Sequence, residues 1–90
     1  MNKAPIFLGS TVISKAGRDE GRTFLVVSVI DDEYVLISDG DTHKMSKPKK
    51  KKRRHLKAAF EPNAEIVTRL TDGQPVFDHE VRRWLSHEEG

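Results

Sequence analysis

The chain has 90 residues, of which 36% are hydrophobic, and it contains no cysteine. This length suits one small domain, and the lack of cysteine excludes disulfides, thiolate metal sites and cysteine nucleophiles. The formal net charge of +2 is unevenly distributed: residues 47–57 hold eight cations and no acid, whereas residues 1–46 carry five cations and seven acids, and residues 58–90 carry three cations and seven acids. We therefore expect a mildly acidic body with one strongly basic segment.

The N-terminal part predicts a loose lead-in followed by a strand and a glycine-containing loop. Residues 1–8 include Pro5, which disfavours a helix, and apolar residues able to cover one end of a core. A first strand is expected over residues 11–15. Residues 16–23 then contain Gly17 and Gly21, each followed directly by an arginine. Because glycine permits positive φ, this loop can turn sharply while it presents its cations outward.

Two runs rich in Val, Ile, Leu, Phe and Tyr follow, at residues 24–30 and 34–38. Both are typical of strands, and the three acids between them allow only a hairpin. In the first run, Phe24, Val26 and Ile30 are expected on one face, with Leu25, Val27 and Val29 on the other. Apolar residues on both faces predict a central strand that is covered on both sides.

The Asp39-Gly40 pair favours a tight turn into a polar fourth strand over residues 42–45. A fifth strand is expected around residues 54–57, so that the lysine run forms the loop before it.

The last third changes to helical spacing. Ile66, Val67 and Leu70 lie between Asn63, a good N-cap, and a glycine that can end a helix. A second helix is expected after Asp78, another N-cap candidate, with its apolar stripe at Val81, Trp84 and Leu85 and with Phe77 folded back over Val81. Helices this short need packing against another element to be stable.

Several segments together resemble a known family. Residues 12–38 look like a KOW motif, a short strand-loop-strand unit of ribosomal and transcription-associated proteins. The series Ser14-Lys15-Ala16-Gly17-Arg18-Asp19, Asp39-Gly40-Asp41, the lysines after Pro48 and the pair His55-Leu56 is similar to KOW-domain RNA-binding proteins related to eukaryotic and archaeal large-subunit ribosomal proteins. The resemblance covers about the first two thirds of the chain, and the compact form is similar to bacterial members.

The expected fold is mainly β within the α+β class. A small SH3-like β-barrel that contains the KOW motif would span residues 9–60, and two short helices over residues 61–90 would pack on the same domain. No apolar run has the length of a signal peptide or of a membrane span. We therefore expect a cytoplasmic protein with no membrane partner, monomeric when free.

The basic segment is the main candidate for function, because a polyanion neutralised by many cations releases its condensed counterions. The resemblance implies that RNA, most of all ribosomal RNA, and the large ribosomal subunit are partners, and that the glycine loop faces RNA. Gly17, Gly21 and Gly40 would shape the loops. The expected RNA-binding residues are Lys15, Arg18, Arg22, Lys44, Lys47, Lys49, Lys50, Lys51, Lys52, Arg53, Arg54, His55 and Lys57.

Other interpretations of the same residues remain open. The lysine run could be a solvated loop or, as PKKKKRR at residues 48–54, a nuclear-import signal. Arg18 and Arg22 could simply pair with the acids beside them. Among the aromatic residues, Phe24 and Trp84 are expected in the core, and Tyr34 could either stack on RNA or pack. A different class of function is a protein-interaction adaptor that binds through the barrel or through exposed apolar residues of the helices.

Enzymatic and metal-dependent functions are not expected. The acids Asp31, Asp32, Asp39 and Asp41 stand where turn chemistry would select them. The four histidines lack partners at metal-ligand spacing, and no serine, lysine or histidine belongs to a recognisable nucleophile motif. We expect no cofactor.

Overall fold

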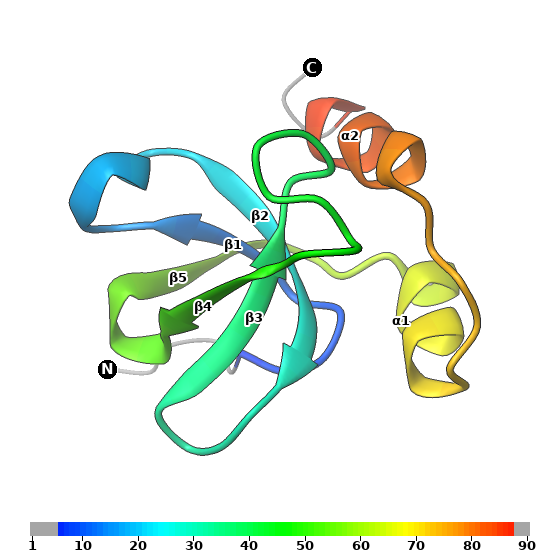
Figure 1. The fold of residues 1–90 in the computed structure, drawn as a ribbon, viewed down its shortest axis with the longest axis horizontal. Helices are drawn as coiled ribbons and strands as arrows, with labels where there is room; N and C mark the ends of the chain where they lie inside the picture. Colours follow the sequence, from blue (N-terminus) through cyan, green and yellow to red (C-terminus); the bar gives the residue numbers. More distant parts are fainter. Residues whose placement is uncertain (1–5, 88–90) are drawn as a thin grey trace.

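Five antiparallel strands and two α-helices make up the fold in the computed structural model, which describes residues 6–87 (Figure 1). The strands are β1 (Thr11–Ser14), β2 (Thr23–Val29), β3 (Tyr34–Ser38), β4 (Lys49–Lys52) and β5 (Leu56–Phe60). Two short 3-10 turns, η1 (Gly17–Asp19) and η2 (Arg53–His55), follow β1 and β4. The helices are α1 (Ala64–Thr71) and α2 (Asp78–His87). The expected lead-in over residues 1–8 lies mostly outside the described residues.

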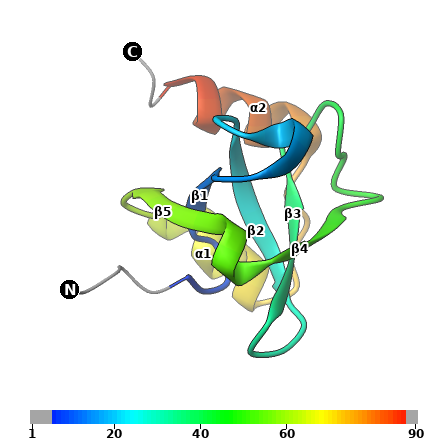
Figure 2. The ribbon, with the colours of Figure 1, turned by 90° about the vertical axis from the view of Figure 1, so that its left-hand side faces the viewer.

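The sheet has the strand order β4-β3-β2-β1-β5, so β4 and β5 are its edges. In a flat five-stranded sheet, four strand spacings would place these edges roughly 19 Å apart. However, only the three residues of η2 join β4 to β5, and such a link spans at most about 14 Å. The sheet must therefore curve, as Figures 1 and 2 show. No ladder joins β4 to β5 within residues 6–87, so closure into a barrel stays a prediction.

Each face of the sheet buries its own apolar cluster, because β2 is apolar on both sides. The inner cluster, which we define as the buried residues enclosed by the curved sheet, contains Val12, Phe24, Val26, Val35, Ile37 and Leu56. The outer cluster lies between the sheet and the helices and contains Leu25, Ile66, Val76, Val81 and Leu85. The two-faced central strand is thus confirmed at Phe24, Leu25 and Val26, all fully buried.

The far end of β2 departs from the expected alternation. Its register with β3 shifts between Val26 and Ser28, where a bulge interrupts the ladder. A bulge changes the side to which later residues point. Ile30 was expected on the same face as Phe24. It lies after the end of β2 and is 45% exposed.

Both helices pack on the outer cluster, and their ends are fixed by side chains. Asn63 caps α1 as predicted, because its Oδ1 accepts hydrogen bonds from the backbone N–H groups of Glu65 and Ile66. The predicted cap of α2 is wrong: Asp78 is the first helical residue, and Glu80 instead accepts a hydrogen bond from the Phe77 N–H. Arg69 joins the helices through two hydrogen bonds to Glu80, of 3.0 and 2.7 Å.

The apolar contacts of α2 differ in one respect from the expectation. Phe77 does not cover Val81, since its side chain is 55% exposed, and Val76 is buried in its place. Trp84 packs against the outer cluster, and its indole N–H donates to Thr11 Oγ1 at 2.9 Å. Within residues 6–87, neither helix has the length and apolar character needed to span a bilayer.

Candidate nucleic-acid interface

The lysine run is a strand and not the predicted loop. Residues 49–52 form β4 and pair with β3 from Tyr34 to Ile37. The predicted strand over residues 42–45 is wrong: these residues belong to the irregular loop 39–48 between β3 and β4. The predicted fifth strand lies further along, as β5, and residues 53–55 form η2. Since side chains alternate along a strand, the four lysines divide into two pairs that face opposite sides.

Lys49 and Lys51 point toward the inner side, because they pair with Ile37 and Val35 of the inner cluster. Their charge is balanced by Asp19 of η1, whose carboxylate lies 2.9 Å from Lys49 Nζ and 4.0 Å from Lys51 Nζ. Lys51 Nζ also donates to the Ala16 carbonyl at 3.3 Å, and its side chain is only 10% exposed. These two lysines therefore hold η1 against β4.

The two lysines favour the charged form of the Asp19 carboxyl. Its side chain is 8% exposed, and the hydrogen bond from Lys49 lowers its pKa below the ordinary value, with further lowering by the charge of Lys51. The Asp19 carboxylate thus stays ionised where burial alone would favour its neutral form. The inward lysines are consequently engaged in ion pairs with Asp19, although the Lys49 side chain is 38% exposed, and they are less available to bind a ligand than the unpaired cations.

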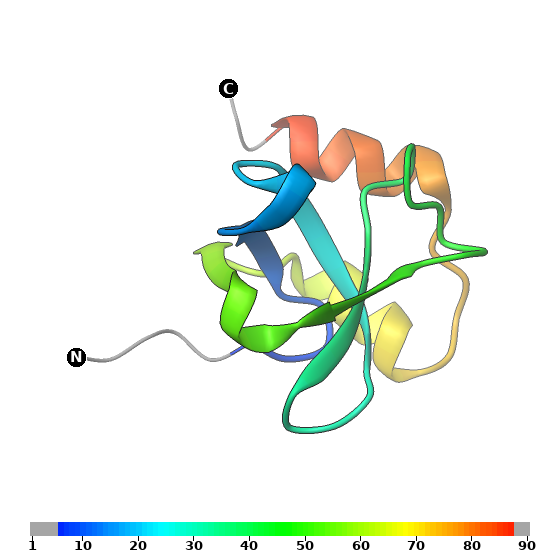
Figure 3. The ribbon, with the colours of Figure 1, turned by 60° about the vertical axis from the view of Figure 1, so that its left-hand side comes forward.

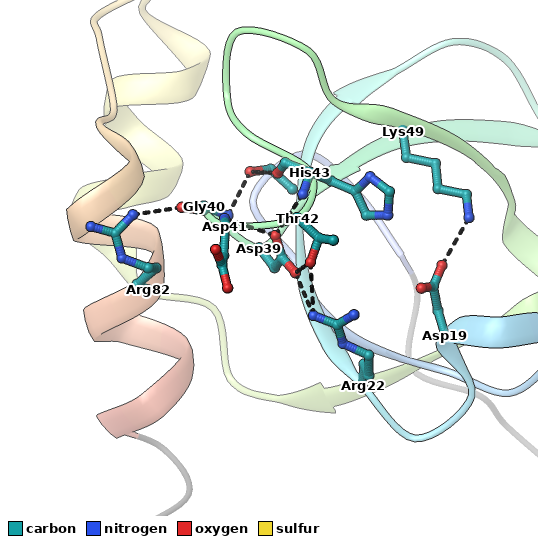
Figure 4. Close-up of polar contacts among 10 residues, drawn as sticks. Asp19, Arg22, Asp39, Gly40, Asp41, Thr42, His43, Lys49 and Arg82 are labelled. Carbon is teal, nitrogen blue, oxygen red and sulfur yellow. Dashed lines mark hydrogen bonds and ion pairs between the residues drawn. The ribbon is translucent and has the colours of Figure 1, made fainter.

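Arg22 has a different partner from the neighbouring acids considered for it. Its guanidinium donates to Asp39 Oδ2 at 2.8 Å and to Thr42 Oγ1 at 3.0 Å (Figure 4). Asp39 in turn accepts hydrogen bonds from the backbone N–H groups of Asp41 and His43, both at 2.9 Å. This network folds loop 39–48 into a compact turn, and that is why the expected two-residue hairpin and fourth strand do not form.

Loop 39–48 is also attached to α2, and Figure 3 shows the two side by side. Arg82 donates to the Gly40 carbonyl at 2.6 Å, and the Met45 N–H donates to Asp78 Oδ1 at 2.7 Å. Gly40 has a φ of +74°, and a Cβ there would collide with the Asp78 carbonyl oxygen. Glycine is therefore needed both for the backbone conformation and for the close approach to α2.

A basic pocket of about 580 Å³ is lined in part by residues of η2. The turn η2 lies on the side of the sheet away from the helices (Figures 1 and 2). The apolar part of the pocket comes from Ile6, Leu56 and Ala58, and Asp32 and Glu33 lie on its wall. Its cations, which we call the pocket cations, are Lys15, Lys52, Arg53, Arg54 and Lys57. Strands β1, β4 and β5, with η2, thus bring together cations that are up to 42 positions apart in the chain.

The pocket cations differ in how firmly they are held. The Arg53 guanidinium donates to the carbonyls of Ile6 and Asp31, at 2.7 and 3.1 Å, so it is fixed as part of the wall. In contrast, Lys15, Arg54 and Lys57 are exposed, and their charged groups form no ion pair or hydrogen bond with any residue from 6 to 87. These three charges are free to meet an anion.

His55 reports the electrostatic potential of this region. Its pKa is lowered, first by partial loss of solvent and then by the charges of Arg54, Lys51, Lys52 and Lys15. A cation is disfavoured where positive charge is not compensated. The region around η2 therefore has an excess of positive charge that suits an anionic ligand.

Lys50 and Lys52 point to the opposite side from Lys49 and Lys51. Tyr34 and Leu36 of β3 share this side, since they pair with Lys52 and Lys50. The Nζ atoms of Lys50 and Lys52 lie 4.4 and 6.0 Å from the centre of the Tyr34 ring. Lys52 also lines the basic pocket, so the Tyr34 side and the pocket are neighbours.

The remaining predicted cations lie apart from the pocket. Arg18 is exposed on η1, whereas Lys44 and Lys47 are exposed on loop 39–48, at the start of β4 and not at its pocket end. The sequence reasoning missed the roles of Asp19 and Asp39 as internal partners of the cations. Tyr34, for which the sequence left stacking on RNA and packing open, lies at the start of β3 beside Lys50 and Lys52.

Other interpretations gain little from these positions. An import signal or a solvated loop needs an accessible linear segment, whereas β4 is paired in the sheet with Lys51 nearly buried. The adaptor hypothesis would be supported by exposed apolar residues of the helices, especially Trp84. Trp84 packs on the outer cluster, whereas Phe77, just before α2, is 55% exposed. Among residues 6–87, no three histidine, aspartate or glutamate side chains come together in a way that could hold a metal ion.

Comparisons with known proteins add no identification. No family model matches the chain, and no curated protein matches it significantly. The resemblance to KOW-domain proteins therefore stays a prediction.

Proposed function

We propose that this protein is a non-enzymatic RNA-binding protein of the KOW type, which binds ribosomal RNA through the basic pocket and the outward lysines of β4. The large ribosomal subunit in the cytoplasm is the proposed place of binding, and the curved sheet is proposed to be an SH3-like barrel. One observation carries the proposal: the exposed Lys15, Arg54 and Lys57 line a single pocket, and none of the three forms an ion pair within residues 6–87.

The chemistry of the pocket favours RNA over a small anion. Its cations stand beside the apolar residues Ile6, Leu56 and Ala58, and Lys50 continues the positive charge along β4. Such a surface can contact several successive phosphates, a geometry that a polyanion provides and a single anion does not. Contacts to phosphates position the RNA without reading its sequence, so only weak sequence preference is expected.

The test is RNA binding by the purified protein across a salt series. If about five cations contact phosphates, log affinity should fall against log salt with a slope of roughly −4. The triple variant Lys15→Gln, Arg54→Gln and Lys57→Gln should lower the affinity and bring the slope to roughly −2. The matched control changes Lys44, Lys47 and Arg83 to Gln, which removes equal charge from exposed positions away from the pocket.

The two variants separate a site from a general charge effect. Equal losses in the pocket variant and the control would mean that net charge alone attracts RNA, and the proposed interface would be wrong. A salt slope near zero for the unmodified protein would exclude phosphate binding altogether. Salt-sensitive retention on isolated large ribosomal subunits, lost only in the pocket variant, is the expected result.

A further inference from the structure

Tyr34 stands at the junction between the outward lysines and the basic pocket. It is the only tyrosine in the chain and pairs across the ladder with Lys52, which lines the pocket. Its neighbour Glu33 lines the same pocket. An aromatic ring and two ammonium groups therefore lie together at the edge of the proposed RNA-binding site.

The backbone of Tyr34 is firmly held. Its N–H donates to Asp31 Oδ1 at 2.8 Å, and its carbonyl accepts hydrogen bonds from the N–H groups of Ile30 and Asp31, at 3.1 and 3.2 Å. The ring itself is half-buried, and its hydroxyl makes no hydrogen bond with any residue from 6 to 87. The ring is thus presented from a rigid position without a polar contact that requires it there.

The contact that the ring does make is easily exchanged. Lys50 is exposed, and its Nζ lies 4.4 Å from the ring centre. A cation–π contact at an exposed position is weak, because water competes for the ammonium group. A flat base can therefore take its place on the ring, while the ammonium moves the short distance to a phosphate of the same strand.

We infer that Tyr34 stacks against an unpaired base of the bound RNA, while Lys50 and Lys52 contact the phosphates on either side of that nucleotide. This inference rests on the proposed function and names its substrate class, a single-stranded segment. Bases in a duplex are stacked on one another and cannot reach a side chain, whereas unpaired bases in loops and ends can. The protein should therefore prefer single strands and loops to duplexes.

The charges around the ring agree with this occupant. The same hairpin carries three acids, Asp31, Asp32 and Glu33, and the carboxylate of Asp31 accepts the N–H groups of Glu33 and Tyr34. Those two hydrogen bonds lower the pKa of Asp31. Its negative charge is thus partly balanced by the backbone, whereas the Nζ atoms of Lys50 and Lys52 lie 4.4 and 6.0 Å from the centre of the ring.

The experiment compares Tyr34→Leu with the conservative variant Tyr34→Phe, which keeps an aromatic face. The probes are oligouridine of about 12 nucleotides and an RNA duplex of equal length, at one salt concentration. Tyr34→Leu should weaken binding of oligouridine about 10-fold and leave duplex binding within about 2-fold, whereas Tyr34→Phe should bind both like the unmodified protein. Thermal unfolding of each variant checks that it is folded.

A second measurement uses the unmodified protein, so it does not depend on a variant that folds. The ring proton signals of Tyr34 should move upfield when oligouridine binds, and the indole signal of Trp84, which packs on the outer cluster against the helices, serves as the internal reference. A polyglutamate peptide, which has charge but no bases, should leave the ring signals in place.

The outcomes distinguish this inference from the proposed function. Unmoved ring signals, or equal losses on both probes in Tyr34→Leu, would overturn the stacking of a base while RNA binding itself stands. If polyglutamate moved the ring as oligouridine does, the surface would be one for acidic peptides. No salt-sensitive binding of any RNA would overturn both.

Discussion

At the scale of single residues, the four consecutive lysines of β4 have two different environments. Lys49 and Lys51 are ion-paired with Asp19, whereas Lys50 and Lys52 face the Tyr34 ring and the solvent. The composition alone makes these lysines equivalent, and only their position on a strand separates them. A variant that neutralises all four would therefore disturb both the stability of the protein and its candidate site.

Asp19→Asn should destabilise the protein, because it removes the counter-charge of two inward lysines. The asparagine keeps the shape but leaves the Lys51 ammonium nearly buried without compensation. We expect a loss of about 2 kcal/mol in the free energy of unfolding, measured by urea denaturation. Glu20→Gln, at the next and exposed residue, is the control and should change little. Similar values for the two variants would show that the ion pair contributes no stability.

At the scale of elements, loop 39–48 connects the sheet to α2. Hydrogen bonds from Arg22 fix one side of the loop, and Arg82 and Asp78 fix the other. Because β4 follows directly from this loop, its start depends on contacts made by a helix that lies far along the chain. The C-terminal helices therefore help to position the strand that carries the candidate site.

Gly40→Ala should be more destabilising than Gly73→Ala, and the difference measures the contact with α2. Both glycines have nearly the same φ, +74° and +73°, so both substitutions carry the strain of a left-handed alanine, about 1 kcal/mol. Only at Gly40 does the added Cβ also meet the Asp78 carbonyl, whereas nothing lies within 4 Å at Gly73. We expect Gly40→Ala to cost at least about 1 kcal/mol more. Equal losses in urea denaturation would show that loop and helix separate without cost.

At the scale of the whole molecule, local patterns predicted the local elements. The first three strands and both helices follow from runs of apolar residues and from caps such as Asn63, which are legible in a few neighbouring residues. Strand β4 could not be found in this way, because a run of lysines has no apolar alternation. It exists because β3 offers a partner and because Asp19, 30 residues earlier than Lys49, neutralises the inward side.

The candidate site was likewise predicted in part. Charge density pointed to the stretch of chain that lines much of the basic pocket, but the pocket needs Lys15 from the end of β1 beside Lys57 of β5, an adjacency set by strand pairing. The tertiary fold also places Ile6 in the pocket and pairs Lys49 and Lys51 with Asp19 instead. Sequence spacing carries no signal for contacts of this kind.

The combined field of the cations around η2 gives a prediction that does not require a ligand. Arg54→Gln should raise the pKa of His55, because Arg54 is the largest of the charges that lower it. Adding salt to the unmodified protein should act in the same direction through screening, and so should bound RNA. The pKa is read from the His55 ring signals in an NMR titration, with Lys44→Gln as the control that leaves it unchanged. A pKa of His55 that stays constant in Arg54→Gln would contradict the field described here.

The same pKa sets the sign of a stability change. Because the folded-state pKa of His55 lies below its ordinary value of 6.5, the unfolded chain binds more protons in that window. The contribution of His55 to stability therefore increases as pH rises from the folded pKa to about 6.5 and is constant above it. Arg54→Gln should raise the pKa of His55 in the folded protein, and the free energy of unfolding should then depend less on pH.

The place of β4 at the edge of the sheet has one more consequence. An edge strand offers unpaired backbone groups to which another chain can add, and this is a common start of aggregation. Here the edge is made of lysines, so two copies brought edge to edge would set like charges against each other. The lysine run thus protects the open side of the sheet against self-association, and any protein that extends this sheet by strand addition would need an acidic strand to do so.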